Sequence, residues 1–295
     1  MVYRSFLAPI DGYTDLPFRL LCQKYGAEAA CVPLVNSTAI ARNPLKMKRV
    51  DAHPDEHNLG IQLVGNSPES VGMATKAITG AMPFVSWLNL NCGCPMVRTV
   101  KSGGGSALLK QPALVVKLLD AMKRHSAVPV TAKIRIKDDL AGTTLFCRQL
   151  ERAGADFLII HGRTPGQGYS GKADWELIKA LHEKLEVPLV GNGDIQSAAE
   201  GRALIKNGYC DSFMAGRGAM ANPMLFTDRT PGPDARIALL REYLELHRRY
   251  RGEPPLQRLK LKAFNLLKGV PEAAALRNSI ARAASVEEIL ALGKN

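Results

Sequence analysis

The sequence is organised as short apolar runs that alternate with helical patterns. Most of the runs are nearly continuous in apolar or β-branched residues, which is typical of strands covered on both faces. The expected strands are Phe6–Ile10, Ala29–Val35, Gly60–Val64, Val85–Asn91, Val130–Ile136, Phe157–His161, Leu189–Asn192 and Ser212–Ala215. The helices expected between them are Leu16–Tyr25, Pro68–Ile78, Ala113–Arg124, Thr143–Ala153, Trp175–Leu185 and Ala198–Asn207.

This alternation predicts an α/β fold, a parallel (β/α)8 TIM barrel over residues 1–230. An open, doubly wound sheet is the structural alternative. No GxGxxG motif follows the first expected strand, which counts against the dinucleotide-binding form of that sheet.

The chain changes character beyond the turn-rich segment Thr227–Pro233. Residues 231–295 are predicted to form a small, all-helical C-terminal domain. Its expected helices are Ala235–Tyr250, Leu256–Leu267, Glu272–Ala283 and Val286–Leu292.

The chain is basic, with 39 Lys and Arg against 27 Asp and Glu, a net charge of +12. The excess is densest beyond Gly232 and suggests a polyanionic partner, although a solvated helical bundle explains it as well. The 46% hydrophobic content excludes a disordered chain. No apolar run is long enough for a membrane span, and the first residues lack a signal-peptide pattern. We therefore expect a cytoplasmic protein with no membrane association.

The six cysteines are scattered, and only Cys92 and Cys94 are close together. Their CxC spacing differs from the CxxC of zinc sites, so no metal site and no disulfide is expected. Cys94 lies between a glycine and a proline after the fourth expected strand. Its thiol could donate a proton or act as a nucleophile, and the other cysteines are interpreted as inert.

Polar residues stand at the carboxyl end of strand after strand, where β/α barrels carry their function. Lys133 and Arg135 lie two apart and therefore on one face of a strand. The glycine-rich turns 191–194 and 216–218 are candidates for a phosphate site, or are simply tight turns. The glycine run at residues 102–106 lacks the P-loop spacing.

Several stretches together resemble the tRNA-dihydrouridine synthases. They are APIDGYTDLPFR (8–19), QLVGNSPE (62–69), NLNCGCP (89–95), SGGGSALL (102–109), AKIRI (132–136), HGRTPGQGYSGKADW (161–175), NGDI (192–195) and AGRGAMANPMLF (215–226). The resemblance implies a barrel that binds flavin mononucleotide (FMN), followed by a helical domain that grips tRNA. It also implies reduction of the C5=C6 bond of specific tRNA uridines to 5,6-dihydrouridine, with NAD(P)H as the reductant. The choice of NADPH over NADH is carried over from the family.

The resemblance also implies residue roles. Cys94 is expected to be the general acid. The expected cofactor-binding residues are Pro9, Ile10, Asp11, Gln62, Lys133, His161, Asn192, Gly193, Asp194, Gly216 and Arg217. The expected substrate-binding residues are Asn91, Arg135 and Tyr169. We expect a monomer.

Three positions depart from the family pattern: Asn89 where an Asp is frequent, Lys137 where a Gly is common, and the second strand, CVPLVNSTAI. These changes are expected at the rim where the substrate is presented. Two other functions stay open at this point. One is an FMN barrel that acts on a free pyrimidine, as dihydroorotate dehydrogenases do, and the other is a catalytically inactive tRNA-binding protein.

Overall fold

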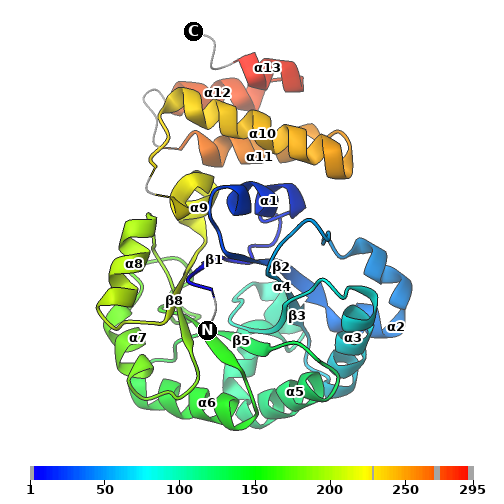
Figure 1. Ribbon diagram of the computed structural model, residues 1–295, viewed down its shortest axis with the longest axis vertical. Helices are drawn as coiled ribbons and strands as arrows, with labels where there is room; N and C mark the ends of the chain where they lie inside the picture. The colour runs from blue at the N-terminus through cyan, green and yellow to red at the C-terminus, as the bar shows by residue number, and fades with distance from the viewer. Residues whose placement is uncertain (1–2, 228, 269–272, 292–295) are drawn as a thin grey trace.

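Eight parallel strands close into a barrel in the computed structural model, which describes residues 3–227, 229–268 and 273–291. Each strand pairs with its sequence neighbours, and β8 pairs with β1 (Figure 1). This arrangement confirms the (β/α)8 barrel and excludes the open sheet. The strands are β1 (Ser5–Leu7), β2 (Ala29–Asn36), β3 (Leu59–Val64), β4 (Trp87–Cys92), β5 (Val130–Arg135), β6 (Phe157–His161), β7 (Leu189–Asn192) and β8 (Ser212–Ala215).

Helices surround the barrel as predicted, and short additional helices occupy several of its loops (Figure 1). The main outer helices are α1 (Leu16–Lys24), α3 (Pro68–Ala81), α5 (Pro112–Arg124), α6 (Leu140–Arg152), α7 (Trp175–His182) and α8 (Ala198–Lys206). The sequence analysis missed the short helices α2 (Ser37–Arg42), α4 (Val97–Lys101) and α9 (Arg217–Ala221) and the 3-10 helices η1 (Pro44–Arg49), η2 (Gly105–Lys110) and η3 (Pro223–Phe226).

Local sequence explains where the outer elements begin and end. The side chains of Asp15, Ser67 and Asp174 each accept a hydrogen bond from the backbone N–H of the third residue of the helix that follows, which satisfies a donor that has no partner within the helix. Strand β1 ends at Leu7 rather than at the predicted Ile10. Pro9 has no N–H for a sheet ladder, so the segment beyond β1 turns into the mouth of the barrel instead.

The predicted C-terminal helices are confirmed as α10 (Pro233–Arg251), α11 (Leu256–Leu266), α12 (Ala273–Arg282) and α13 (Val286–Ala291). The predicted ends Glu272 and Leu292, and Asp228 of the expected linker, lie outside the described residues. Figure 1 shows α10 and α11 stacked on one edge of the barrel beside α1 and α9. In the described part of the chain, no helix is both long and apolar enough to cross a membrane.

The C-terminal helices and the barrel share one apolar core. Phe18 and Leu21 of α1 belong to the same buried cluster as Leu240 of α10 and Leu259 of α11. The chain therefore changes near residue 230 from alternating strands and helices to helices alone, but the apolar core continues across this point. That residues 231–295 form a domain of their own stays a prediction.

A buried ion pair fastens α11 to the turn that follows β1. Lys262 of α11, 3% exposed, lies 3.1 Å from the carboxylate of Asp15 and donates to the carbonyl of Tyr13. Tyr243 donates a 2.8 Å hydrogen bond to the same carboxylate, and Arg258 lies 3.2 Å from it. Burial raises the pKa of Asp15, but Lys262 and the Tyr243 hydrogen bond outweigh it and hold that pKa below its usual range.

We expect Lys262→Met to lower the free energy of unfolding by about 2–3 kcal/mol, because it removes one partner of a buried carboxylate while Arg258 and Tyr243 remain. Urea unfolding followed by circular dichroism measures this loss. Lys260→Met in the same helix is the matched control, because within the described part of the chain the ammonium of Lys260 bonds only the carbonyl of Ala281, at the surface. Equal losses in the two variants would contradict a structural role for the buried pair.

Candidate functional site

Every site residue expected from the sequence lines one cavity, of about 350 Å³, at the carboxyl ends of the strands. We call it the barrel cavity. These residues are Pro9, Ile10, Asp11, Gln62, Asn91, Cys94, Lys133, Arg135, His161, Tyr169, Asn192, Gly193, Asp194, Gly216 and Arg217. The structure therefore brings together residues from seven of the eight strands or the loops that follow them, while their individual roles stay predictions.

A chain of hydrogen-bonded amides crosses one side of the cavity. Asn91 donates to Gln62 at 2.7 Å, and Gln62 donates to Asn89 at 2.8 Å. Asn89 then donates to the Thr131 hydroxyl at 2.6 Å. Because all of these polar atoms are buried and partnered, the chain holds Gln62 and Asn91 in fixed orientations.

Asn89 is fully buried beneath the cavity, so its expected place at the rim is wrong. The strand that carries it is hydrogen-bonded on both sides and has no exposed face. The second strand, whose sequence also departs from the family pattern, does reach the cavity through Leu34. The backbone of Leu34 is left-handed, at φ +44°, and lies at a register shift in β2. An apolar residue within a strand gives no signal of such a role in the sequence.

The turn after β4 presents Cys94 to the cavity. Asn91 Oδ1 accepts from the backbone N–H groups of Gly93 and Cys94, at 3.2 and 3.0 Å. The Cys94 thiol is half-buried, and its Sγ lies 3.8 Å from Thr99 Oγ1. The other five cysteines are buried, which raises the pKa of each thiol. Cys94 is thus the one cysteine that the fold leaves accessible.

Lys133 reaches across the cavity to β7. Its Nζ donates to Asn192 Oδ1 at 2.8 Å, and Asn192 in turn donates to the Met214 carbonyl at 2.7 Å. Burial, together with the charge of Arg135, lowers the pKa of Lys133 to about 7. Burial and the surrounding cations lower the pKa of His161 to about 2. His161 is therefore a neutral imidazole at physiological pH.

Asp194 turns its carboxylate toward two arginines. Arg163 lies 2.7 Å from it, Arg217 lies 2.9 Å from it, and the N–H of Ala173 donates to it at 2.8 Å. The carboxylate thereby fixes the guanidinium of Arg217 at the cavity wall. Arg163 is 2% exposed and also donates to the carbonyls of Ser170 and Gly171. The sequence analysis quoted Arg163 within the HGRT stretch without assigning it a role.

Tyr169 stands at the mouth of the cavity with its side chain 58% exposed. Its ring centroid lies 4.6 Å from the guanidinium carbon of Arg217 and 5.7 Å from that of Arg135. Arg135 also donates to the carbonyls of Thr164 and Gly168, in the loop that carries Tyr169. Two cation–π contacts thus hold an aromatic face at the entrance.

The remaining walls of the cavity are largely apolar or glycine, and the sequence analysis did not single them out. They are Ala8, Tyr13, Leu34, Gly93, Pro95, Met96, Ile195, Gln196 and Gly218. Apolar walls, a fixed amide edge and a cluster of cations at one end suit a flat ring system that carries an anionic tail. A (β/α)8 barrel with such a cavity at its carboxyl end defines a class of enzymes that bind phosphorylated cofactors or substrates.

The family model described as "Dihydrouridine synthase (Dus)" matches residues 6–294. The chain is 34% identical to tRNA-dihydrouridine synthase B of Pseudomonas aeruginosa, over 83% of this chain and 77% of that protein. It is 31% identical to probable tRNA-dihydrouridine synthase 1 of Synechocystis (97% and 84%) and 29% identical to the probable tRNA-dihydrouridine synthase of Aquifex aeolicus (96% and 93%). The chain belongs to the dihydrouridine synthase family.

Among solved structures, the fold is similar to histamine dehydrogenase from a Rhizobium species, with a TM-score of 0.59 and 12% identity over 82% of this chain. It is also similar to a 2-naphthoyl-CoA reductase, with a TM-score of 0.57 and 9% identity over 75% of this chain. The chain spans about half of each of those proteins, 49% in both cases. At these identities the similarity supports the barrel fold alone.

The lowered pKa of Lys133 predicts a pH-dependent stability. In the unfolded chain this lysine regains its ordinary pKa of 10.5, so between pH 7 and pH 9 the unfolded state binds more protons than the folded state. The free energy of unfolding of the ligand-free protein should therefore rise over this range, by about 1–2 kcal/mol from Lys133. Urea unfolding at both pH values measures it. Lys133→Met should lack this rise, and an identical pH response in that variant would contradict the interpretation.

Proposed function

We propose that this protein reduces the C5=C6 bond of uridines in tRNA to 5,6-dihydrouridine, with FMN as cofactor and NADPH as reductant. The proposal rests on two observations together: the family match spans nearly the whole chain, and one cavity is lined by every site residue that the family resemblance led us to expect. The hydrogen-bonded amides of Gln62 and Asn91, the positive charge near Arg217 and the accessible thiol of Cys94 each have a use in this reaction.

The residues of the barrel cavity fit FMN. A Cβ at Gly193 would lie 2.5 Å from Ala173 Cβ, and one at Gly216 would lie 3.2 Å from the Ile10 side chain. A side chain at either position would crowd these neighbours, so glycine fits best there, and its bare backbone allows a phosphate to approach closely. Arg217 and Lys133 supply positive charge there and on the opposite wall.

In the proposed complex, Asn192, Gly193, Gly216 and Arg217 hold the phosphate end, and Pro9, Ile10 and Asp11 lie along the cofactor with Gln62, Lys133 and His161. Asp194 is better placed to orient Arg217 than to touch a phosphate, because its carboxylate already accepts from two arginines and would repel a second anion. When bound, the reduced flavin would supply the hydride that uracil accepts at C6.

Cys94 is proposed to deliver the proton that completes the reduction at C5. The hydrogen bonds from the Gly93 and Cys94 backbone to Asn91 hold the thiol beside the amide edge. Asn91 keeps one amide hydrogen for the uracil, since its other donates to Gln62. Tyr169 and Arg135 at the mouth offer a stacking surface to a uridine drawn out of the tRNA.

The direct test supplies the purified protein with FMN, NADPH and unmodified tRNA and measures dihydrouridine by mass spectrometry. We expect dihydrouridine at specific positions and no turnover of orotate, dihydroorotate or free uridine, because the net charge of +12 favours a polyanionic substrate over a free pyrimidine. Turnover of a free pyrimidine without turnover of tRNA would overturn the proposal. A protein that binds tRNA but takes up no FMN would favour a catalytically inactive binder.

Cys94→Ala should retain the yellow flavin and tRNA affinity but lose activity by about 10²–10⁴-fold, the usual contribution of a positioned general acid. Single-turnover reduction of tRNA by the prereduced enzyme measures the loss. Cys92→Ala is the control, because that buried thiol packs in the apolar core away from the cavity. Unchanged single-turnover rates in Cys94→Ala would remove this residue from the acid role.

A further inference from the structure

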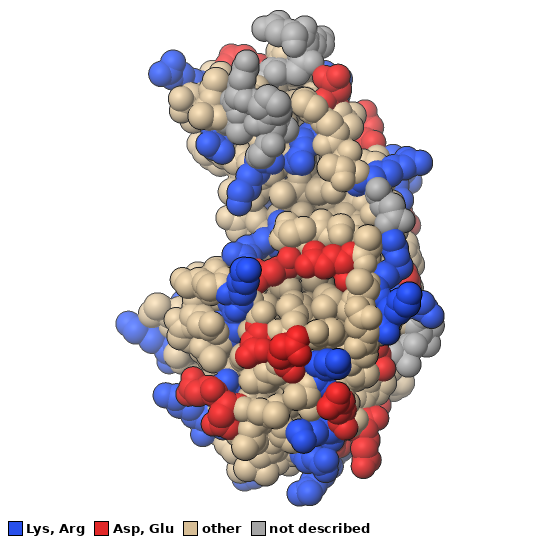
Figure 2. All heavy atoms as spheres, turned by 90° about the vertical axis from the view of Figure 1, so that its left-hand side faces the viewer, with Lys and Arg blue, Asp and Glu red and all other residues tan. Residues whose placement is uncertain are grey.

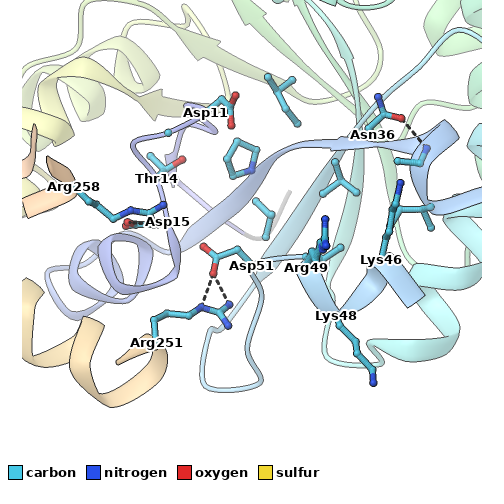
Figure 3. Close-up of a pocket in the computed structure, with 18 residues that line it drawn as sticks. Asp11, Thr14, Asp15, Asn36, Lys46, Lys48, Arg49, Asp51, Arg251 and Arg258 are labelled. Atoms are coloured by element: carbon cyan, nitrogen blue, oxygen red, sulfur yellow. Dashed lines mark hydrogen bonds and ion pairs between the residues drawn. The ribbon is translucent and has the colours of Figure 1, made fainter. Parts of the chain in front are cut away.

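A second hollow, of about 600 Å³, adjoins the barrel cavity, and we call it the basic hollow. Asp11 and Leu34 line both spaces, so the two are neighbours across the loop after β1 and the bend in β2. Figure 3 shows the hollow between η1 on one side and Arg251 and Arg258 of the C-terminal helices on the other. Nothing in the proposed chemistry uses it.

Five cationic and three anionic side chains line the basic hollow, and only some of the cations have a carboxylate partner. Arg251 lies against Asp51, with its Nε 2.8 Å from the carboxylate (Figure 3), and Arg258 is 3.2 Å from Asp15. Each of these two arginines therefore already has a carboxylate partner within the protein. The third carboxylate, Asp11, lies at the border with the barrel cavity.

The other three cations, Lys46, Lys48 and Arg49, are exposed and have no ion-pair or hydrogen-bond partner for their side chains among the described residues. They lie on a segment that the fold holds firmly. Asn43 caps η1 through the N–H of Leu45, and Met47 is buried in the core. Three like charges on one fixed segment repel one another, so anions that bind beside them relieve this repulsion without ordering the backbone.

We propose that Lys46, Lys48 and Arg49 bind the sugar-phosphate backbone of the tRNA beside the uridine that enters the barrel cavity. This inference rests on the proposed function and adds a phosphate-binding segment on the barrel to the expected grip of the C-terminal helices. A nucleotide drawn out of a stack needs its flanking phosphates held. The basic hollow is the space next to the cavity that can hold them.

The shape of the surface favours a polymer over a free dinucleotide. Figure 2, which views the molecule from the α7 and α8 side, shows a waist between the barrel and the C-terminal helices, with Lys and Arg side chains above and below it and a band of Asp and Glu side chains across it. The three unpaired cations are spread over an exposed segment instead of converging on one point. Successive phosphates of a strand match such a row, whereas NADPH offers only one diphosphate and one separate 2′-phosphate and so has no continuous row of phosphates.

The test compares two triple variants of the full-length, flavin-loaded protein that remove equal charge. K46S/K48S/R49S removes the three positive charges of the proposed phosphate-binding segment. R152S/K184S/K206S removes one arginine and two lysines, all exposed, from positions at or just beyond the C-terminal ends of α6, α7 and α8. Those ends lie at the barrel face opposite the cavity, because each outer helix runs antiparallel to its strand. Bound flavin and the thermal midpoint are measured for both.

We expect K46S/K48S/R49S to weaken tRNA binding at least tenfold at 0.1 M salt and to reduce the slope of log Kd against log salt by about 2. The KM for tRNA should rise while kcat at saturating tRNA and the KM for NADPH stay unchanged. The control triple variant should change the tRNA Kd less than threefold.

Equal effects of the two triple variants would overturn the proposal, since the loss would then report net charge alone. A raised KM for NADPH with unchanged tRNA binding would also overturn it and would assign the basic hollow to the dinucleotide. Dihydrouridine formation by the wild-type protein in the same assay distinguishes a failure of the proposed function from a failure of this inference. If the wild-type protein is inactive on tRNA, the proposed function fails; if it is active and the variant matches it, this inference alone fails.

Discussion

Closure of the sheet between β1 and β8 is the constraint on which the site depends. The pairing of Ser5 with Phe213 and of Leu7 with Ala215 joins the first strand to the last. It brings the turn after β1 against the turn after β8, so that Ile10 packs beside Gly216. An open sheet of the same strands would leave these turns at opposite edges, and the ring of polar side chains would not enclose a cavity.

Inside that ring, electrostatics sets the character of the site. Lys133, Arg135, Arg163 and Arg217 crowd around a neutral His161, and Asp194 is the carboxylate that ties two of the arginines in place. Burial of so much positive charge costs stability, which is why the pKa of Lys133 is lowered. A bound anion recovers part of that cost. The same cations that weaken the ligand-free fold therefore favour a phosphorylated cofactor.

The loop after β1 connects this chemistry to the rest of the molecule. Tyr13 lines the barrel cavity, its carbonyl accepts from Lys262 of α11, and the neighbouring Asp15 bonds Tyr243 of α10. Asp11 in the same loop borders the basic hollow. A shift of the C-terminal helices would thus be felt at the cavity wall. The packing of these helices on α1 places any RNA held by them at a fixed distance from the reacting centre.

Sequence patterns predicted the barrel, the bounds of β6, β7 and β8 and the C-terminal helices, because apolar periodicity marks each strand and turn residues separate the elements. The residues that line the cavity were expected from the family resemblance, and their individual roles stay predictions. Only the folded structure reveals the buried place of Asn89, the pairing of Asp194 with Arg163 and Arg217, and the cations of η1 that have no partner among the described residues. Each of those depends on which distant segment supplies the partner, and no local pattern encodes a contact between residues that meet only when the barrel closes.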